Sequence, residues 1–176
     1  MPRRIILRHD GEMAPPQQFR LTKYDPAVRD GTGAYTADDW IMFSQIGDEF
    51  DGERLTLAKY LDVEARHLVV LASFIEESGT AELAAEGVEN SGGAFRVAEA
   101  AKLSPIEAIE AVRQMLRDEG WCRLIDDDRF YIHIGWDYYV YVGTDRPCER
   151  SVALAESVGL FVDRDFPSPY LSDEEG

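Results

Sequence analysis

Residues 130–143, with the sequence FYIHIGWDYYVYVG, alternate between two kinds of side chain more regularly than any other stretch of the chain. Successive side chains of a β-strand point to opposite faces, so the alternation predicts a strand with one apolar and one polar-aromatic face. The predicted core face consists of Phe130, Ile132, Ile134, Trp136, Tyr138, Val140 and Val142. The opposite face consists of Tyr131, His133, Gly135, Asp137, Tyr139 and Tyr141, and the glycine indicates a bulge or bend.

Two longer segments carry apolar side chains at helical spacing. The first is predicted to run from about Thr56 to Ser78, where Gly79 favours a helix end, and only Glu64 interrupts its apolar stripe. The second has the clearer start, because Ser104, Pro105 and Glu107 match a capping box with proline in the first turn. Its predicted buried stripe consists of Ile106, Ile109, Val112 and Met115 or Leu116, and Gly120 is expected to close it.

Shorter elements are predicted around these helices. Residues 121–142 are expected to form an antiparallel hairpin in which Ile132, Ile134, Val140 and Val142 are buried. Further strands are predicted at residues 3–8, 19–24, 82–88 and 160–162, and further helices at 95–102 and 148–158. The combination indicates an α+β fold, with helices packed on an antiparallel β-sheet. We expect a single domain over residues 1–170, loop-rich in 1–54, and an acidic disordered tail at 171–176.

The charge balance is the most unusual property of the composition. Acidic residues number 34 and basic residues 18, which gives a net charge of −16. A field of this sign repels nucleic acid and anionic membranes and attracts basic partners, although solubility alone would also explain it. The one basic cluster, Arg3, Arg4 and Arg8, is too small for direct nucleic-acid binding. No segment approaches the roughly 20 apolar residues of a membrane helix, and we expect a cytoplasmic protein without membrane contact.

Few residues offer catalytic chemistry. His133 and Asp137 are of the types needed for acid–base catalysis, but four residues of extended strand span roughly 13 Å, beyond hydrogen-bond reach. Only a sharp bend, or a partner on a neighbouring strand, would bring either into a catalytic site. Cys122 is expected to pack in a strand, Cys148 to precede a helix and His67 to lie on a helix surface. No spacing matches a metal site, a disulfide framework or a phosphate loop, so we predict no catalytic residue, metal or cofactor.

The polar-aromatic face of residues 130–143 has the composition that is enriched at recognition surfaces. If this sheet face is open, its tyrosines supply rigid anchors for a partner. A helix of the same domain that covers the face would fit the sequence equally well. The candidate partner-binding residues are Tyr131, His133, Asp137, Tyr139 and Tyr141.

Six blocks of sequence, in order from Leu21 onward, resemble a family of small bacterial proteins. The blocks are LTKYDPAVRD (21–30), DDWIMFSQIG (38–47), LTLAKYLDVE (55–64), RDEGWCRL (117–124), FYIHIGWDYYVYVG (130–143) and GLFV with SPY (159–170). That family is similar to the immunity proteins of polymorphic-toxin and contact-dependent inhibition systems. The chain departs from the family pattern at Trp136, where tyrosine is usual, and at Ile41–Phe43, where smaller polar residues are common. The resemblance supplies no catalytic residue.

Together these features lead us to expect a protein-binding module, and specifically an immunity protein that occludes a basic toxin domain with an acidic, aromatic surface. Two alternatives remain: a regulatory or small-ligand-binding module, and a small hydrolase or transferase that uses His133 and a nearby carboxylate. A flat, exposed, tyrosine-rich face would favour the binding protein. A deep pocket with His133 beside a carboxylate would favour the enzyme.

Overall fold

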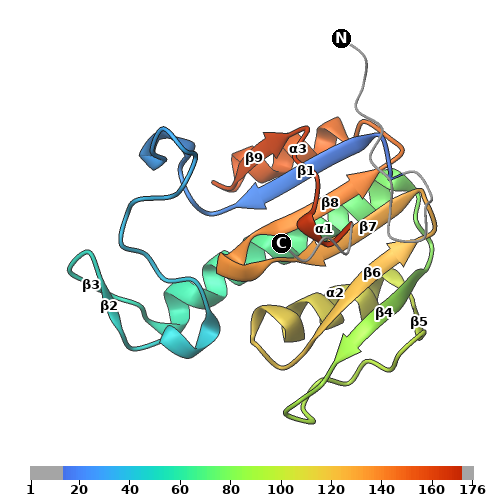
Figure 1. The fold of residues 1–176 in the computed structure, drawn as a ribbon, viewed down its shortest axis with the longest axis horizontal. Helices are drawn as coiled ribbons and strands as arrows, with labels where there is room; N and C mark the ends of the chain where they lie inside the picture. Colours follow the sequence, from blue (N-terminus) through green and yellow to red (C-terminus); the bar gives the residue numbers. More distant parts are fainter. Residues whose placement is uncertain (1–13, 172–176) are drawn as a thin grey trace.

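The computed structural model describes residues 14–171, and in this part of the chain seven antiparallel strands form one sheet in the order β5-β4-β6-β7-β8-β1-β9 (Figure 1). The strands are β1 Gln17–Thr22, β4 Leu83–Glu89, β5 Lys102–Leu103, β6 Trp121–Asp126, β7 Phe130–Ile134, β8 Val140–Thr144 and β9 Phe161–Arg164. A separate two-stranded hairpin, β2 Glu49–Phe50 and β3 Glu53–Arg54, projects beyond one end of the sheet (Figure 1).

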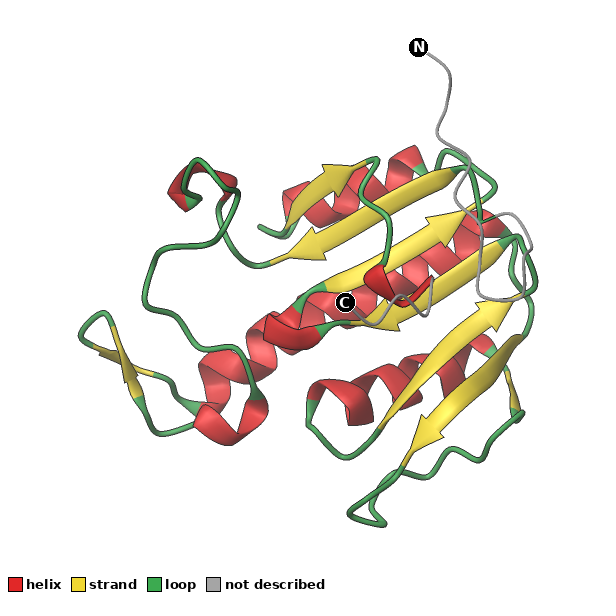
Figure 2. Ribbon diagram, viewed as in Figure 1, coloured by secondary structure: helices red, strands yellow, loops and turns green. Residues whose placement is uncertain are grey.

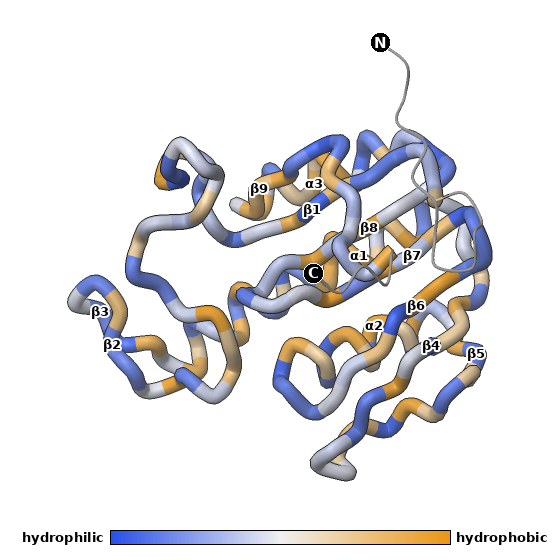
Figure 3. The backbone as a smooth tube through the Cα atoms, in the orientation of Figure 1, coloured by the Kyte–Doolittle hydropathy of each residue, from blue (hydrophilic) through white to orange (hydrophobic). Residues whose placement is uncertain are grey.

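Within residues 14–171, three helices cover one face of the sheet and are drawn in red in Figure 2. They are α1 Leu57–Ser78, α2 Pro105–Leu116 and α3 Glu149–Ser157. Apolar residues of the helices and central strands form the main core between the two layers, and the backbone of such residues is coloured orange in Figure 3. Short 3₁₀ helices in the connections are η1 Pro26–Val28, η2 Phe43–Gln45, η3 Trp136–Tyr138 and η4 Pro169–Leu171. This is the predicted α+β fold, and no helix of the described chain has the length and apolar composition of a membrane span.

Local sequence explains where the two long helices begin. The Thr56 hydroxyl accepts a hydrogen bond from the Lys59 amide at 3.2 Å, and Gly79 ends α1 with φ +76°, which glycine adopts without strain. In α2 the Glu107 carboxylate accepts the Ser104 amide at 2.8 Å, while the Ser104 hydroxyl accepts the Glu107 amide at 3.5 Å. Both predicted helix starts are confirmed.

The buried side of α2 agrees with the prediction at Val112, Met115 and Leu116 but differs at the start of the helix. Ile106 is 83% exposed, and the helix ends at Leu116, before Gly120. The core-facing stripe lies at i, i+3, i+4 and i+7 spacing, and Ile106 lies off this stripe. The stripe consists of Ala108, Ala111, Val112 and Met115.

A glutamate and a histidine in the middle of α1 are buried. Glu64, which interrupts the apolar stripe, is 3% exposed because Arg117 pairs with it from the end of α2. His67 is fully buried, so its predicted surface position was wrong. Its Nδ1 lies 2.9 Å from the Val63 carbonyl, which can only accept, so Nδ1 carries the proton. Burial lowers the pKa of His67 to about 4, and the ring is therefore neutral near pH 7.

This histidine predicts a pH-dependent loss of stability. Its pKa is about 4 in the folded protein and about 6.5 when unfolded, so the unfolded state takes up the proton first as the pH falls. The stabilisation is complete above pH 6.5 and is lost between pH 6.5 and 4. At pH 5 we expect the free energy of unfolding to be lower than at pH 7.5 by about 2 kcal/mol from this residue. Urea unfolding of wild type and His67→Asn at the two pH values measures it, and an equal drop in both proteins would contradict the assignment.

Residues 130–143 do not form the single strand that their alternation predicts. β7 ends at Ile134, the chain turns through η3, and β8 returns antiparallel with Ile134 opposite Val140. Directly opposed residues share a face of the sheet, so the predicted core residues Ile132, Ile134, Val140 and Val142 stay buried despite the reversal. The predicted pairing of the 121–126 strand with the start of this run is confirmed by β6 and β7.

The remaining predictions have mixed outcomes. Strand β4, the edge strand β9 and helix α3 lie close to their predicted ranges. The helix predicted at residues 95–102 was wrong: the Glu99 carboxylate accepts the Gly87 and Val88 amides at 3.1 and 2.7 Å, which holds this segment against the edge of β4. The strand predicted at residues 3–8 lies outside the described residues, as does the acidic tail except for Leu171, which is buried.

Candidate functional site

The turn between β7 and β8 presents a large aromatic side chain to solvent. Trp136 is 82% exposed, although the alternating pattern had assigned it to the core face. The Gly135 amide donates a hydrogen bond to the Tyr139 carbonyl at 2.7 Å and closes the turn. Asp137 and Tyr138 have φ of +61° and +63°, a left-handed conformation that is uncommon for residues other than glycine. We call residues 135–139 the hairpin tip.

Tyr138 anchors the hairpin tip in the core. Its ring packs edge-on against Trp40 and Tyr60, with centroids 5.0 and 5.9 Å away, and against His67 at 5.2 Å. Its hydroxyl donates to the Tyr60 hydroxyl at 3.2 Å, which in turn donates to the Leu116 carbonyl at 2.6 Å. Burial raises the pKa of the Tyr138 phenol, so it stays neutral. This buried chain of hydrogen bonds fixes the turn, and Trp136 is therefore held on a rigid support.

The predicted recognition face is largely covered by the C-terminal segment 165–171, which includes η4 (Figure 1). Tyr131, His133 and Tyr141 are 2%, 1% and 7% exposed. His133 Nδ1 lies 2.8 Å from the Ser168 hydroxyl, and its ring stacks on Tyr131 at 4.3 Å. Ile125 and Leu171 are buried in the same cluster, and Tyr139 and Tyr170 pack against it while partly exposed. Of the two arrangements open to the sequence, the covered one is observed, and the cover is a mostly irregular segment that ends in the 3₁₀ helix η4 and contains no α-helix.

A glycine makes room for this cluster. The Tyr131 ring lies over Gly143 on the neighbouring strand, where any Cβ would overlap the ring. Its hydroxyl donates to the Gln18 side chain. Burial raises the pKa of the Tyr131 phenol, and it therefore serves as a neutral hydrogen-bond donor in the cluster.

The other two predicted partner-binding residues reach the surface. Asp137 is exposed on the hairpin tip next to Trp136. Tyr139 is half-buried, with its ring 5.5 Å from that of Tyr24 and 4.6 Å from the Arg20 guanidinium. The structure therefore separates the five predicted residues into a covered group and an accessible pair, and adds Trp136 to the pair. Gly135 and Asp137 were the sequence features that could have located this turn, because a Cβ at Gly135 would meet the Tyr141 ring and Asp137 tolerates the left-handed backbone it adopts.

The loop that follows β1 packs against the hairpin tip. Lys23 Nζ lies 2.6 Å from the Asp39 carboxylate and 4.0 Å from the centroid of the Trp40 ring. Burial lowers the pKa of Lys23 to about 8, although the hydrogen bond to Asp39 opposes this effect. The Tyr24 hydroxyl donates to the Trp40 carbonyl at 3.1 Å. Trp40 is thus the residue that joins the loop, the core and Tyr138 of the tip.

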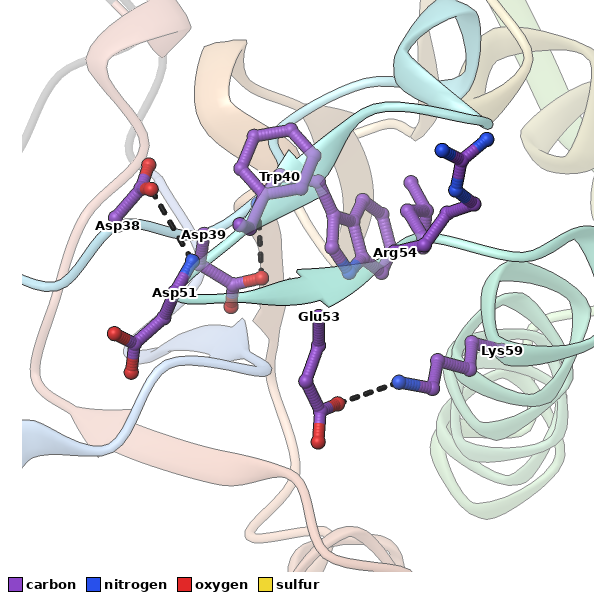
Figure 4. Close-up of a pocket in the computed structure, with 9 residues that line it drawn as sticks. Asp38, Asp39, Trp40, Asp51, Glu53, Arg54 and Lys59 are labelled. Atoms are coloured by element: carbon purple, nitrogen blue, oxygen red, sulfur yellow. Dashed lines mark hydrogen bonds and ion pairs between the residues drawn. The ribbon is translucent and has the colours of Figure 1, made fainter.

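A half-open pocket of about 290 Å³ lies beside Trp40, between this loop, the β2–β3 hairpin and the start of α1 (Figure 4). Three apolar residues, Trp40, Phe50 and Leu55, line it together with six charged ones: Asp38, Asp39, Asp51, Glu53, Arg54 and Lys59. In Figure 4 the carboxylates of Asp38, Asp39 and Asp51 gather on one side, and Arg54 and Lys59 lie on the other. We call this the β2–β3 pocket.

The cysteines are not placed for nucleophilic chemistry. Cys122 and Cys148 are buried free thiols. Burial raises the pKa of Cys122 to about 12 and also raises that of Cys148, so both stay protonated near pH 7. Cys148 does precede α3, as predicted, but its side chain makes no capping hydrogen bond. Among residues 14–171, no cluster of three or more His, Cys, Asp or Glu side chains could hold a metal ion.

Comparisons of the chain with protein-family models, with curated proteins and with solved structures gave no match. Function is therefore inferred from the residues themselves: an exposed tryptophan on a rigid turn, an adjacent carboxylate, and an acidic pocket close by.

Proposed function

We propose that this protein is a binding module that neutralises a basic toxin domain in the cytoplasm, and that the hairpin tip is the centre of its binding surface. The observation that carries the proposal is the exposure of Trp136, which is 82% exposed on the hairpin tip. Tyr138, in the same turn, is buried in the core and hydrogen-bonded to Tyr60, and it holds the turn in place. Tryptophan is enriched among the residues that dominate binding energy, and a rigid support lowers the entropic cost of binding through it. A large apolar side chain that is exposed to water contributes most to the free energy of binding when a partner buries it.

Charge supports a basic partner. The net charge is −16, and Asp137 is exposed beside Trp136. The adjoining segment 23–59 is itself acidic, with eight Asp and Glu residues against four Lys and Arg residues, and each of the four basic residues is paired with a carboxylate. These pairs are Lys23–Asp39, Arg29–Asp163, Arg54–Glu49 and Lys59–Glu53. Toxins that act on nucleic acid need a basic surface, and an acidic protein both attracts and covers such a surface.

The resemblance of the sequence blocks to immunity-like proteins agrees with this proposal, and Trp136 is one of the positions at which the chain departs from the family pattern. Under the proposal, this departure adapts the hairpin tip to one particular toxin. Under the proposal, the covered residues Tyr131, His133 and Tyr141 stabilise the end of the sheet that carries the hairpin tip, and they do not contact the toxin.

Neutralisation of a toxin is the expected result of co-expression. Cells that make a basic toxin domain encoded by a gene next to this protein's gene should regain growth when the protein is co-expressed, and the absence of any such toxin gene would count against the proposal. With purified proteins, the association rate should fall at least about tenfold between about 0.05 and 0.5 M salt, because steering between opposite charges is screened.

An uninhibited toxin, or an association rate that does not respond to salt, would contradict the proposal. Turnover of a small substrate by the purified protein, abolished in a folded His133→Gln variant, would instead assign the chain to the hydrolases or transferases.

A further inference from the structure

The β2–β3 pocket has the size of a site for a single side chain. Its volume is about 290 Å³, at the lower limit of the roughly 300–1,000 Å³ typical of small-molecule sites. Trp40 and Leu55 are 7% and 3% exposed and, with the half-buried Phe50, supply its apolar lining. A long side chain with an apolar stem and a polar end matches this combination of apolar lining and charged rim.

The charges of the pocket favour a cationic end group. Arg54 and Lys59 already have partners, at 3.7 Å from Glu49 and 2.5 Å from Glu53. Asp38 and Asp51 form no ion pair with any residue of the described chain, although Asp38 accepts the Asp51 amide at 3.2 Å and is oriented by it. A cation that enters on the side of these two carboxylates therefore displaces no existing pair.

The protein itself shows that this wall binds a cationic amine. Lys23 lies against Asp39 at 2.6 Å and over the Trp40 ring at 4.0 Å, and its side chain is only 7% exposed. The same two residues line the pocket. A carboxylate next to an aromatic ring is thus already a cation site in this fold, and Asp38 and Asp51 extend it toward solvent.

We infer that the β2–β3 pocket receives an arginine side chain of the basic partner. Arginine suits it better than lysine because a planar guanidinium can bridge two carboxylates and pack on an aromatic surface at the same time. The pocket lies beside the hairpin tip, since Trp40 contacts Tyr138, so one partner can engage both. The inference rests on the proposed function only for the identity of the partner.

The test uses N-acetyl-arginine amide as the probe and the indole N–H signal of Trp40 in nitrogen-15 NMR spectra as the readout. We expect a saturable shift at millimolar probe, and no shift with N-acetyl-citrulline amide, which has the same shape without the charge. Asp38→Asn with Asp51→Asn should weaken binding at least about fivefold. The control pair is Asp127→Asn with Asp128→Asn, which changes the net charge equally. Asp51 and Asp127 both have positive φ, +47° and +43°, which asparagine tolerates, so the two pairs are also matched in backbone strain.

A loss of binding confined to the pocket pair supports the inference. No shift of Trp40, an equal shift with citrulline amide, or equal weakening by both pairs overturns it. The probe contains no toxin, so this measurement is independent of the growth assay. If growth is restored but Trp40 does not respond, the pocket inference alone fails; if Trp40 responds but growth is not restored, the proposed function alone fails.

Discussion

Replacing Arg117 by alanine is expected to destabilise the protein by about 3 kcal/mol, the lower end of the range for breaking a buried ion pair. The Arg117 guanidinium donates to both Glu64 oxygens, at 2.7 and 2.6 Å. The Glu64 side chain is 4% exposed, so the variant leaves a carboxylate buried without its cation. Arg117 itself is 31% exposed, and water that enters its place keeps the cost below the upper limit of about 5 kcal/mol.

Arg113, in the last turn of α2 just before Arg117, provides the control. Arg113 pairs with Glu110 on the surface of α2, where the two side chains are 39% and 48% exposed. Its replacement by alanine should cost no more than about 0.5 kcal/mol, because an exposed pair gains little over its hydrated ions. Urea unfolding of the two variants measures the difference. Equal losses in both would show that the Glu64–Arg117 pair does not join α1 to α2 in the way described.

The Glu64–Arg117 pair also shows where sequence reasoning stopped. Apolar spacing and capping residues predicted both long helices, since these signals depend on neighbours within one turn. Glu64 could be recognised as an interruption of the stripe, but its partner lies 53 residues away and belongs to another helix. His67 was misplaced for the same reason: its ring packs against Tyr138, which lies far along the chain in the turn between β7 and β8.

The sequence pointed to the segment that contains the candidate site, but not to the residues of that segment that are exposed. Residues 130–143 were recognised as the informative segment, and the core side chains on both sides of the turn follow the predicted alternation. Across this turn even-numbered residues pair with even-numbered residues, so the alternation of apolar and polar positions continues unchanged from β7 into β8. The alternation alone therefore could not reveal the turn. The cover over His133 comes from residues 165–171, whose sequence carries no periodic signal. The site therefore moved from a sheet face to the tip of a hairpin.

Replacing Trp136 by alanine is expected to weaken binding to the toxin by about 2–4 kcal/mol, the range of a tryptophan hot spot. This corresponds to a rise in Kd of about 30-fold to 1,000-fold. The change should lie mainly in the dissociation rate, because the charges that steer association are unaltered. The fold should tolerate the substitution, since Trp136 is 82% exposed and contributes little to the core. The melting temperature of the variant should equal that of the wild type.

The most direct test of the account is the affinity of the purified toxin domain for wild type, Trp136→Ala and Ile106→Ala. Ile106 is a matched control, because it is 83% exposed and lies in the first turn of α2, on an element outside the hairpin tip. The account predicts that Trp136→Ala raises Kd at least about 30-fold while Ile106→Ala leaves it within about twofold. A folded Trp136→Ala variant that binds the toxin as tightly as wild type would contradict the hairpin tip as the centre of the binding surface.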